Sequence, residues 1–316
     1  MRRISILVGL SLTLTLAACA EPGQQGQPAG GVKHPAYEAF EQRATTVAEA
    51  WRSKPGLDEA WRKGFVPLQD ATVVPLDAGF TDETKQAFSA GWYRHEVTLP
   101  AEKPANGTIR FPDGTLDVPL VSAVQAYEEL DQGDPPPCPG RPAEPPASPT
   151  GPDSPDSMAA SACVPLTVTK ATLGTVTVRT SRGEAEVPAW LFSIAELKAP
   201  IARLAVAPSA VAPLPEAPAP ADDLAEGLVS VQDLTGVDGA TLSYRLGVGA
   251  CDTDITPLLY ESKDVVVIGG AVTRSDGICT DQLVLEPVTI TLTAPLGTRI
   301  VLDAASGQPL LLTTFT

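Results

Sequence analysis

The sequence predicts a mainly β protein with a small N-terminal α+β domain, followed by disulfide-stapled, β-sandwich-like modules joined by proline-rich linkers. Three observations lead to this fold class. Apolar residues recur at helical spacing only before Gly133, whereas from Leu166 onward short segments alternate between apolar and polar residues. The 316 residues include 32 prolines, about twice the usual share, and these cluster between the patterned segments. Four of the 5 cysteines lie beyond the N-terminal region, enough for two disulfides.

The N-terminus has the pattern of an export signal. Arg2 and Arg3 precede an apolar run from Ile4 to Ala18 that is too short to cross a bilayer as a helix, which needs roughly 20 residues. The arginines match only part of the twin-arginine motif, so the sequence does not decide between Sec and twin-arginine export. The run ends in Leu16-Ala17-Ala18-Cys19, which resembles the bacterial lipobox at every position.

The lipobox resemblance implies that residues 1–18 are a lipoprotein signal peptide and that Cys19 is lipidated on its sulfur. An ordinary cleaved signal with a cysteine near its end is the alternative. Two or more acyl chains hold a protein stably on a membrane. Residues 19–35, rich in Gly, Gln and Pro, then form a flexible tether.

Residues 36–132 are expected to form the small α+β domain. Tyr37, Phe40, Ala44, Val47 and Trp51 recur at three- and four-residue steps, which predicts an amphipathic helix. Helices are expected at Pro35–Ser53, Asp58–Lys63, Asp82–Trp92 (with Thr81 as N-cap) and Leu120–Leu130. A strand is expected at Tyr93–Leu99. A hairpin of Thr108–Phe111 and Thr115–Val118 is expected about the turn Pro112-Asp113-Gly114.

Two proline-rich stretches divide the rest of the chain. Residues 133–160 are expected to be a disordered insert, and residues 208–226 a semi-rigid Pro/Ala linker. Between them lies the β segment 161–207. Its expected strands are Leu166–Thr169, Thr175–Val178 after a turn at Gly174, Glu184–Val187 and Trp190–Ile194.

Residues 227–316 are expected to form a C-terminal β module. Its predicted strands are Thr241–Val248, Leu258–Glu261, Val265–Val272, Gln282–Leu285, Val288–Leu292 and Ile300–Leu302, with turns that include Gly269-Gly270. The pattern Leu-x-Ala-Pro occurs at Leu197 and again at Leu292. Either the two β segments are divergent copies of one module, or the similarity is chance.

Cys138, Cys163, Cys251 and Cys279 remain after Cys19 is set aside, and an even number in an exported protein indicates two disulfides. Three connectivities are possible. We favour Cys138–Cys163 and Cys251–Cys279, since each pair brackets a contiguous segment. Each bridge would contribute on the order of 3–4 kcal/mol in the chain-entropy model.

The C-terminal stretch resembles a module that recurs in secreted lipoproteins of high-GC Gram-positive (actinobacterial-type) bacteria. The residues that carry the resemblance are Cys251-Asp252, Cys279 and Pro295-Leu296-Gly297-Thr298-Arg299. The stretch from Thr180-Ser181-Arg182-Gly183 to Trp190 is similar to a companion segment of that group. The group has no assigned biochemical activity, so the resemblance implies a location and no catalytic residues.

The charge balance excludes one class of function. The chain carries 22 basic against 38 acidic residues, a formal net charge of −16, and no basic stripe. Because Lys and Arg on phosphates supply most nucleic-acid affinity, we expect no nucleic-acid partner. The same charge disfavours anionic wall polymers and lipid headgroups, and favours a protein or cationic partner.

The sequence shows no Gly-x-Ser-x-Gly, His-Glu-x-x-His or Ser-x-x-Lys motif. His95 beside Glu96 is a poor acid–base pair, because neighbours on a strand point to opposite faces. Trp190 and Phe192 alternate on one strand, where core packing is favoured over stacking on a sugar. We therefore expect no catalytic residues.

The nearest approach to a metal site is the pair Asp252 and Asp254, two residues apart, since calcium takes oxygen ligands from such loops. A solvated acidic loop is the interpretation that we prefer. We accordingly expect no metal and no cofactor.

These observations together predict a lipid-anchored protein on the outer, extracytoplasmic face of the cell membrane. We expect it to act as a binding or scaffolding module rather than an enzyme, with an envelope protein as a candidate partner. An envelope hydrolase with a carboxylate or Ser/His site assembled by the fold is the alternative. A solute-binding lipoprotein would need βαβ units, which the helix-poor second half disfavours.

Replacing Cys19 with Ala should release the protein from the membrane, because the thioether needs the Cys19 sulfur and no other anchor is predicted. Immunoblots of membrane and soluble fractions measure this, with Ser11→Ala as a control that leaves the lipobox intact. Membrane association that survives Cys19→Ala would contradict the anchor.

Overall fold

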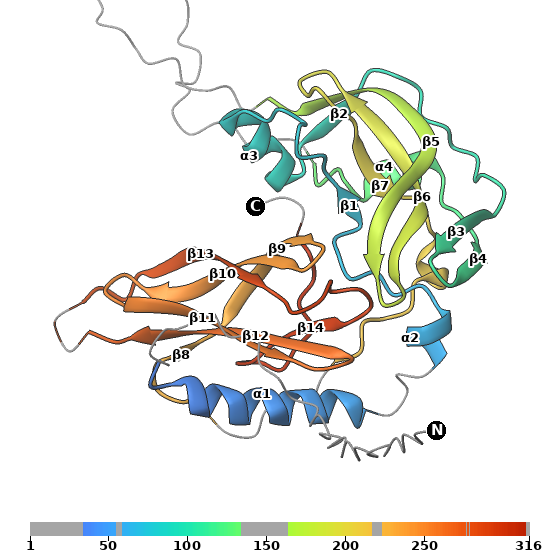
Figure 1. The fold of residues 1–316 in the computed structure, drawn as a ribbon. Helices are drawn as coiled ribbons and strands as arrows, with labels where there is room; N and C mark the ends of the chain where they lie inside the picture. The colour runs from blue at the N-terminus through green and yellow to red at the C-terminus, as the bar shows by residue number, and fades with distance from the viewer. Residues whose placement is uncertain are drawn as a thin grey trace, which may run out of the picture.

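The computed structural model describes residues 34–54, 59–133, 164–216, 223–275, 277 and 279–313. The predicted signal peptide 1–18 with Cys19, most of the tether and the insert, and both Cys138 and Cys163 lie outside these residues. The described chain is mainly β, as predicted, and forms two lobes (Figure 1).

The first lobe is built on a seven-stranded sheet. Its centre is a long antiparallel hairpin of β5 and β6, and β2 runs parallel to β5. β7 and then β1 extend the sheet from β6, while the β3–β4 hairpin joins β6 through one residue pair. The strands are β1 (Thr72–Val73), β2 (Tyr93–His95), β3 (Gly107–Phe111), β4 (Gly114–Val118), β5 (Leu166–Thr180), β6 (Gly183–Ile194) and β7 (Ile201–Leu204), and the helices are α2 (Glu59–Lys63), α3 (Asp82–Ala90) and α4 (Ala123–Glu128).

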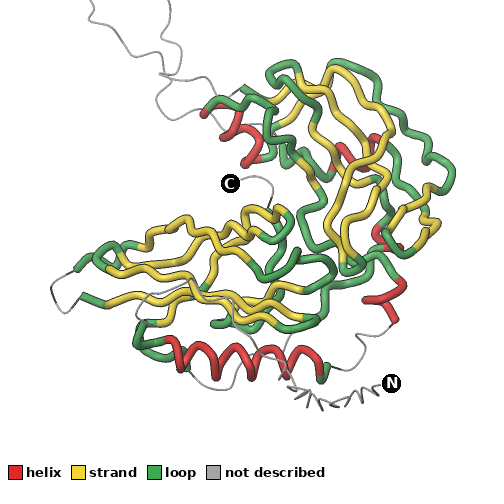
Figure 2. Tube along the Cα trace, viewed as in Figure 1, coloured by secondary structure: helices red, strands yellow, loops and turns green. Residues whose placement is uncertain are grey.

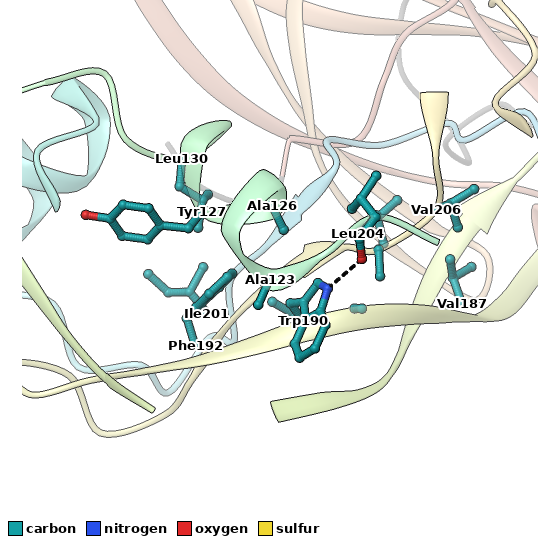
Figure 3. Packing of buried hydrophobic residues seen from close by; sticks show 14 of the residues in the cluster. Ala123, Ala126, Tyr127, Leu130, Val187, Trp190, Phe192, Ile201, Leu204 and Val206 are labelled. Atoms are coloured by element: carbon teal, nitrogen blue, oxygen red, sulfur yellow. Dashed lines mark hydrogen bonds between the residues drawn. The ribbon is translucent and has the colours of Figure 1, made fainter. Parts of the chain in front are cut away.

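A single apolar core holds this lobe together (Figure 3). Trp190 and Phe192 are 5% and 0% exposed, so both pack in the core, as we expected from their alternation in the sequence. The Trp190 indole N–H donates to the carbonyl of Val121 at 3.0 Å, which satisfies its only polar atom. Helix α4 is thereby fixed over β6 and β7.

The second lobe has three layers, visible in Figures 1 and 2: one helix and two sheets. Helix α1 covers one face of a four-stranded sheet, and a three-stranded sheet covers the other face. The helix is α1 (Tyr37–Arg52); the first sheet contains β8 (Leu228–Val229), β11 (Thr253–Glu261), β12 (Val265–Thr273) and β14 (Ile300–Asp303), and the second contains β9 (Val231–Asp238), β10 (Thr241–Gly249) and β13 (Leu283–Thr291).

Strand β12 is buried on both faces because it lies between α1 and the second sheet. Val265 and Val267 pack with the α1 residues, whereas Val266 and Ile268 pack with the opposite sheet. The predicted turn at Gly269-Gly270 is wrong, since both glycines lie inside β12. A Cβ on Gly270 would come within 2.4 Å of Leu246, so these glycines allow the layers to approach closely.

Several predicted strands are longer than expected. Gly174 lies within β5 rather than at a turn, and the two segments expected on either side of Pro188 form the one strand β6. The two segments about Pro287 likewise form β13. Among the described strands, β13 is an edge strand that pairs only with β10, and an edge strand tolerates the missing N–H of Pro287. The strand expected at Tyr93–Leu99 ends at His95.

The helices were predicted well. All four occur, and Thr81 caps α3: its hydroxyl accepts from the Thr84 N–H at 3.3 Å while the Thr84 hydroxyl accepts from the Thr81 N–H. The hairpin about Pro112-Asp113 is also confirmed. The two Leu-x-Ala-Pro segments lead into β7, antiparallel to β6, and β14, parallel to β12, so they hold different places in the topology.

The elements are grouped differently from the expected division into 36–132, 161–207 and 227–316. Helix α1 packs on the C-terminal module, where Phe40 and Trp51 join the core of β12 and β14. Strands β2 to β4 complete the sheet of β5 to β7. Helix α1 has an apolar stripe that only the second lobe covers, which explains why it leaves its sequence neighbours.

Residues 65–70, here called the seam, connect the two lobes. The Leu68 N–H donates to Arg179 O at 2.8 Å in the first lobe, and Leu68 O accepts from Leu312 N at 2.9 Å in the second. Phe65 packs in the first core, whereas Val66 and Leu68 pack in the second. The seam is therefore shared by both lobes.

The first half of the expected linker 208–226 is also packed. Val211 forms a parallel bridge with Phe65, and the Ala212 N–H donates to Phe65 O at 2.9 Å. Ala212 and Leu214 pack against the second core. Residues 208–216 are therefore part of the folded structure rather than a free spacer, and residues 217–222 lie outside the described residues.

Replacing Gly270 with Ala should destabilise the protein by about 1–3 kcal/mol, because the new methyl group overpacks the space between β12 and Leu246. Urea unfolding monitored by circular dichroism measures the change. Gly277→Ala is the control, since among the described residues, its chain neighbours aside, only the Ser275 hydroxyl lies within 4 Å of the place that its Cβ would take. Equal stability of the two variants would contradict the close packing.

Candidate functional site

The described residues line several hollows. One of them, about 960 Å³, lies between the lobes and is lined by Trp51, Trp61 and several basic residues. Its guanidinium groups are already engaged: Arg52 pairs with Asp264 at 3.0 Å, and Arg182 with Asp113 at 2.7 Å. These groups hold the walls of the groove in place.

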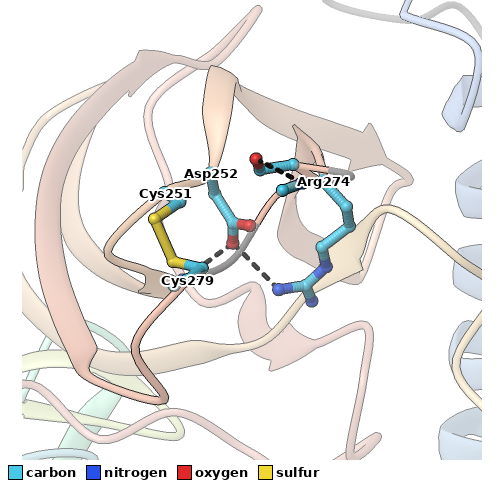
Figure 4. The surroundings of a disulfide bond; sticks show 7 residues. Cys251, Asp252, Arg274 and Cys279 are labelled. Atoms are coloured by element: carbon cyan, nitrogen blue, oxygen red, sulfur yellow. Dashed lines mark hydrogen bonds and ion pairs between the residues drawn. A yellow bond between two sulfur atoms is a disulfide. The ribbon is translucent and has the colours of Figure 1, made fainter.

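A second hollow, about 450 Å³, lies beside the disulfide (Figure 4). The predicted Cys251–Cys279 bridge is confirmed. The Asp252 carboxylate, 6% exposed, accepts from the Gly249 N–H at 2.7 Å and from Arg274 at 2.9 Å. Asp252 thus helps to order the loop beside the bridge.

The calcium interpretation of Asp252 and Asp254 receives no support from this arrangement. Arg274 and the Gly249 N–H both donate to Asp252 Oδ2, and a guanidinium is a poor neighbour for a cation. Asp254 is solvent-exposed at φ 52°. Within the described ranges, no three His, Cys, Asp or Glu residues gather where they could hold a metal ion.

The third hollow, about 400 Å³, is here called the Tyr93 cavity. Five segments of the first lobe converge on it: the end of the seam with β1, the end of α3, the start of β2, the end of α4, and β7. Its lining residues are Asp70, Ala71, Thr72, Phe88, Ser89, Gly91, Tyr93, Glu129, Leu130, Gln132 and Arg203.

Local structure fixes these walls. Helix α3 ends at Gly91, whose φ of +68° is the left-handed conformation that glycine adopts readily. Gly91 O accepts from the Gln132 N–H at 2.8 Å, which joins the ends of α3 and α4. On the other side, Thr72 pairs with Arg203 across β1 and β7. The cavity is thus bounded by hydrogen-bonded backbone.

Tyr93 lines this cavity, and its hydroxyl is buried. Tyr93 is 4% exposed, and its Oη has no hydrogen-bond partner in the described part of the chain. Burial raises the pKa of Tyr93 well above its usual value, and Tyr127 and Asp131 raise it further. A buried polar group left without a partner costs about 1–3 kcal/mol, so proteins rarely keep one.

Most of the charged groups in the cavity are hydrogen-bonded to one another. Arg203 donates to Glu129 Oε2 through Nη2 at 2.5 Å and Nε at 3.0 Å, and to the Thr72 hydroxyl at 2.9 Å. Among the residues described, the Asp70 carboxylate accepts no hydrogen bond. Desolvation raises the pKa of Asp70, and the opposing charge of Arg203 does not offset it. The Asp70 carboxylate is exposed and so remains available to a ligand, whereas the Tyr93 hydroxyl is buried.

The residues singled out from the sequence do not meet in this cavity. His95 Nδ1 contacts Val97 O at 2.9 Å, and its ring lies edge-on to Tyr127 at 5.1 Å. Glu96 pairs instead with Arg94 at 3.8 Å. The structure thus brings together neither the His95–Glu96 pair nor the two loop aspartates as a metal site.

Sequence reasoning missed Asp70, Tyr93, Glu129 and Arg203 because they are scattered over more than a hundred residues and belong to no motif. Only the β1–β7 pairing and the junction of the two helix ends bring them together. The one local signal was Gly91, a C-cap that places Tyr93 at the start of a strand.

Replacing Tyr93 with Phe should raise the free energy of unfolding, by about 1 kcal/mol or more, because it removes a buried hydroxyl that lacks a partner. Tyr244→Phe is the matched control. The Tyr244 hydroxyl donates to Gly269 O at 3.1 Å, so its loss should destabilise by about 1 kcal/mol. Urea unfolding compares the two variants, and equal destabilisation by both would show that the Tyr93 hydroxyl has a partner.

No family model, no curated protein and no solved structure matches this chain. No helix in the described ranges is long and apolar enough to cross a membrane.

Proposed function

We propose that this chain is a binding protein of the cell envelope, held by a lipid on Cys19 to the outer face of the membrane, and that the Tyr93 cavity is its ligand site. The lipobox at Leu16–Cys19 supports the location. In this proposal the protein is a lipoprotein of the actinobacterial type, and its tether presents the first folded helix at the membrane surface.

The observation that carries the binding function is a cavity of about 400 Å³ whose wall contains the exposed Asp70 carboxylate and the Arg203–Glu129 ion pair. This volume lies in the range of small-molecule sites, which combine apolar walls with a few placed polar groups. Asp70 is exposed in this wall and accepts no hydrogen bond from the described residues, so a ligand can bind its carboxylate directly.

An envelope hydrolase is the second candidate, and one observation favours it. Asp70 and Glu129 line the same cavity, and the raised pKa of Asp70 suits a general acid. Against it, Glu129 is bound by two nitrogens of Arg203 and is poorly placed to act as a base or nucleophile. The same geometry suits a binding site, where a fixed ion pair forms one wall.

A cavity-filling variant separates these functions. Full-length protein in detergent is dialysed against small envelope solutes, and the retained solutes are identified by mass spectrometry. We expect the unsubstituted protein to retain a solute that Ser89→Trp, which fills the cavity mouth, does not retain. Gln86→Trp is the control, since Gln86 is exposed on the same helix but does not line the cavity.

Equal retention by Ser89→Trp and Gln86→Trp would contradict binding in this cavity. Conversion of the solute to products, abolished by Asp70→Asn, would instead establish the hydrolase. The two outcomes are distinct because a binding protein returns the solute unchanged.

A further inference from the structure

We infer that the open edge of β5, residues 171–177, is an interaction surface, and that its partner is the same edge of a second copy of this chain, paired in antiparallel orientation. This inference goes beyond the proposed function, because residues 171–177 do not line the Tyr93 cavity.

Strand β5 is paired on one side only along this part of its length. Strand β2 pairs with β5 as far as Val168, and the seam bonds to β5 at Arg179. Between these two points, and within the described residues, β5 pairs with β6 alone and forms no other backbone hydrogen bond. Residues 171–177 are therefore a sheet edge that no described segment covers with a strand.

The contacts of Arg179 show which backbone groups face this edge. Its N–H donates to the Gln69 side chain at 2.7 Å, and its C=O accepts from the Leu68 N–H at 2.8 Å, so both point away from β6. The register with β6 is unbroken from residue 170 to residue 180, and backbone direction alternates along a strand. Every second residue therefore also points its N–H and C=O to the open edge. Those residues are Ala171, Leu173, Thr175 and Thr177.

Two edge strands of the second lobe show how this chain blocks such pairing. Among the described strands, β13 pairs only with β10 and β11 only with β12, and they carry Pro287 and Pro257. Backbone bonds of Leu292 and Ser262 show that the even-numbered residues next to these prolines face the neighbouring strand. Each proline nitrogen therefore points to the open edge, where it offers no N–H to an approaching strand. Residues 171–177 of β5 contain no proline, so this edge lacks that protection.

A second copy fits this edge in register. Residues 171–177 are centred on Gly174, so antiparallel pairing about a twofold axis at Gly174 would place Leu173 of one copy opposite Thr175 of the other. The two Leu173 side chains would then lie on one face as diagonal neighbours, within reach of each other. Leu173 is 40% exposed, and this contact would remove part of its apolar surface from water.

The charge pattern also favours a second copy at this place. The net charge of −16 makes two copies repel each other over most of their surface. Residues 157–183 are the longest stretch of the sequence without Asp or Glu, and β5 lies within it. Lys170 is the one charged residue next to the paired segment, and antiparallel pairing would put the two copies of Lys170 at opposite ends. The pairing thus brings no like charges together.

Sedimentation equilibrium of the full-length protein in density-matched detergent tests this inference. We expect a monomer–dimer equilibrium, which Thr175→Pro should weaken about tenfold or more. This variant removes an N–H that faces the open edge and leaves the β5–β6 ladder intact. Thr289→Pro is the control, because its N–H also faces an open edge, but on β13, which Pro287 already blocks.

A second variant tests the contact at the twofold axis. Leu173→Asp places two carboxylates beside each other in the dimer, and should also weaken it about tenfold or more. Leu285→Asp on β13 is the matched control, since Leu285 is likewise 40% exposed, and should leave the dimer unchanged. Urea unfolding of all four variants separates lost pairing from lost folding.

Two results would overturn the inference. A protein that remains monomeric at hundreds of micromolar would show that this edge does not pair with a second copy. A dimer that withstands both Thr175→Pro and Leu173→Asp would place the interface outside β5. Neither result bears on the Tyr93 cavity, which the solute-retention experiment with Ser89→Trp tests separately.

Discussion

Residues 65–70 form backbone hydrogen bonds to both lobes, and the rest of the structure depends on this shared segment. Leu68 donates to Arg179 and accepts from Leu312, while the amide oxygen of Gln69 accepts from the Arg179 N–H at 2.7 Å. Alternate side chains enter opposite cores, as the two faces of an extended chain require. Asp70 follows directly, so the same pairing that joins the lobes places a carboxylate at the Tyr93 cavity.

The Arg179 side chain adds a second constraint at this junction. It is 7% exposed and donates to Arg299 O at 2.8 Å and to Gly297 O at 3.4 Å in the other lobe. Burial, together with the like charge of nearby Arg299, lowers the pKa of Arg179 to about 10, although Glu184 acts in the opposite direction. A buried guanidinium held by carbonyl groups tolerates little displacement, because separation of the lobes would remove its acceptors.

The net charge of −16 describes the surface as a whole but not each site on it. The groove between the lobes gathers Arg52, Arg62, Arg182 and Lys263, whereas the Tyr93 cavity has an excess of negative charge. The reason is local: an ion pair cancels Arg203 and leaves Asp70.

The sequence was sufficient for elements with local signals. The apolar stripe of α1, the Thr81 cap and the Cys251–Cys279 bridge were all predicted from neighbouring residues, and the structure contains them. It was insufficient where the role of a residue depends on packing against residues far away in the sequence. Gly269-Gly270 has the pattern of a turn, yet the glycines allow close approach of Leu246 and α1. Long-range pairing also decides the candidate site, since Asp70 and Arg203 meet only through β1 and β7. The chemistry of the cavity therefore could not be predicted from motifs.

A crystal structure of the full chain with the solute that it retains tests the central claim most directly. The account predicts density for that solute between α3, α4 and β1, within hydrogen-bond distance of the Asp70 carboxylate. Density for the solute elsewhere on the protein, with this cavity empty, would contradict it.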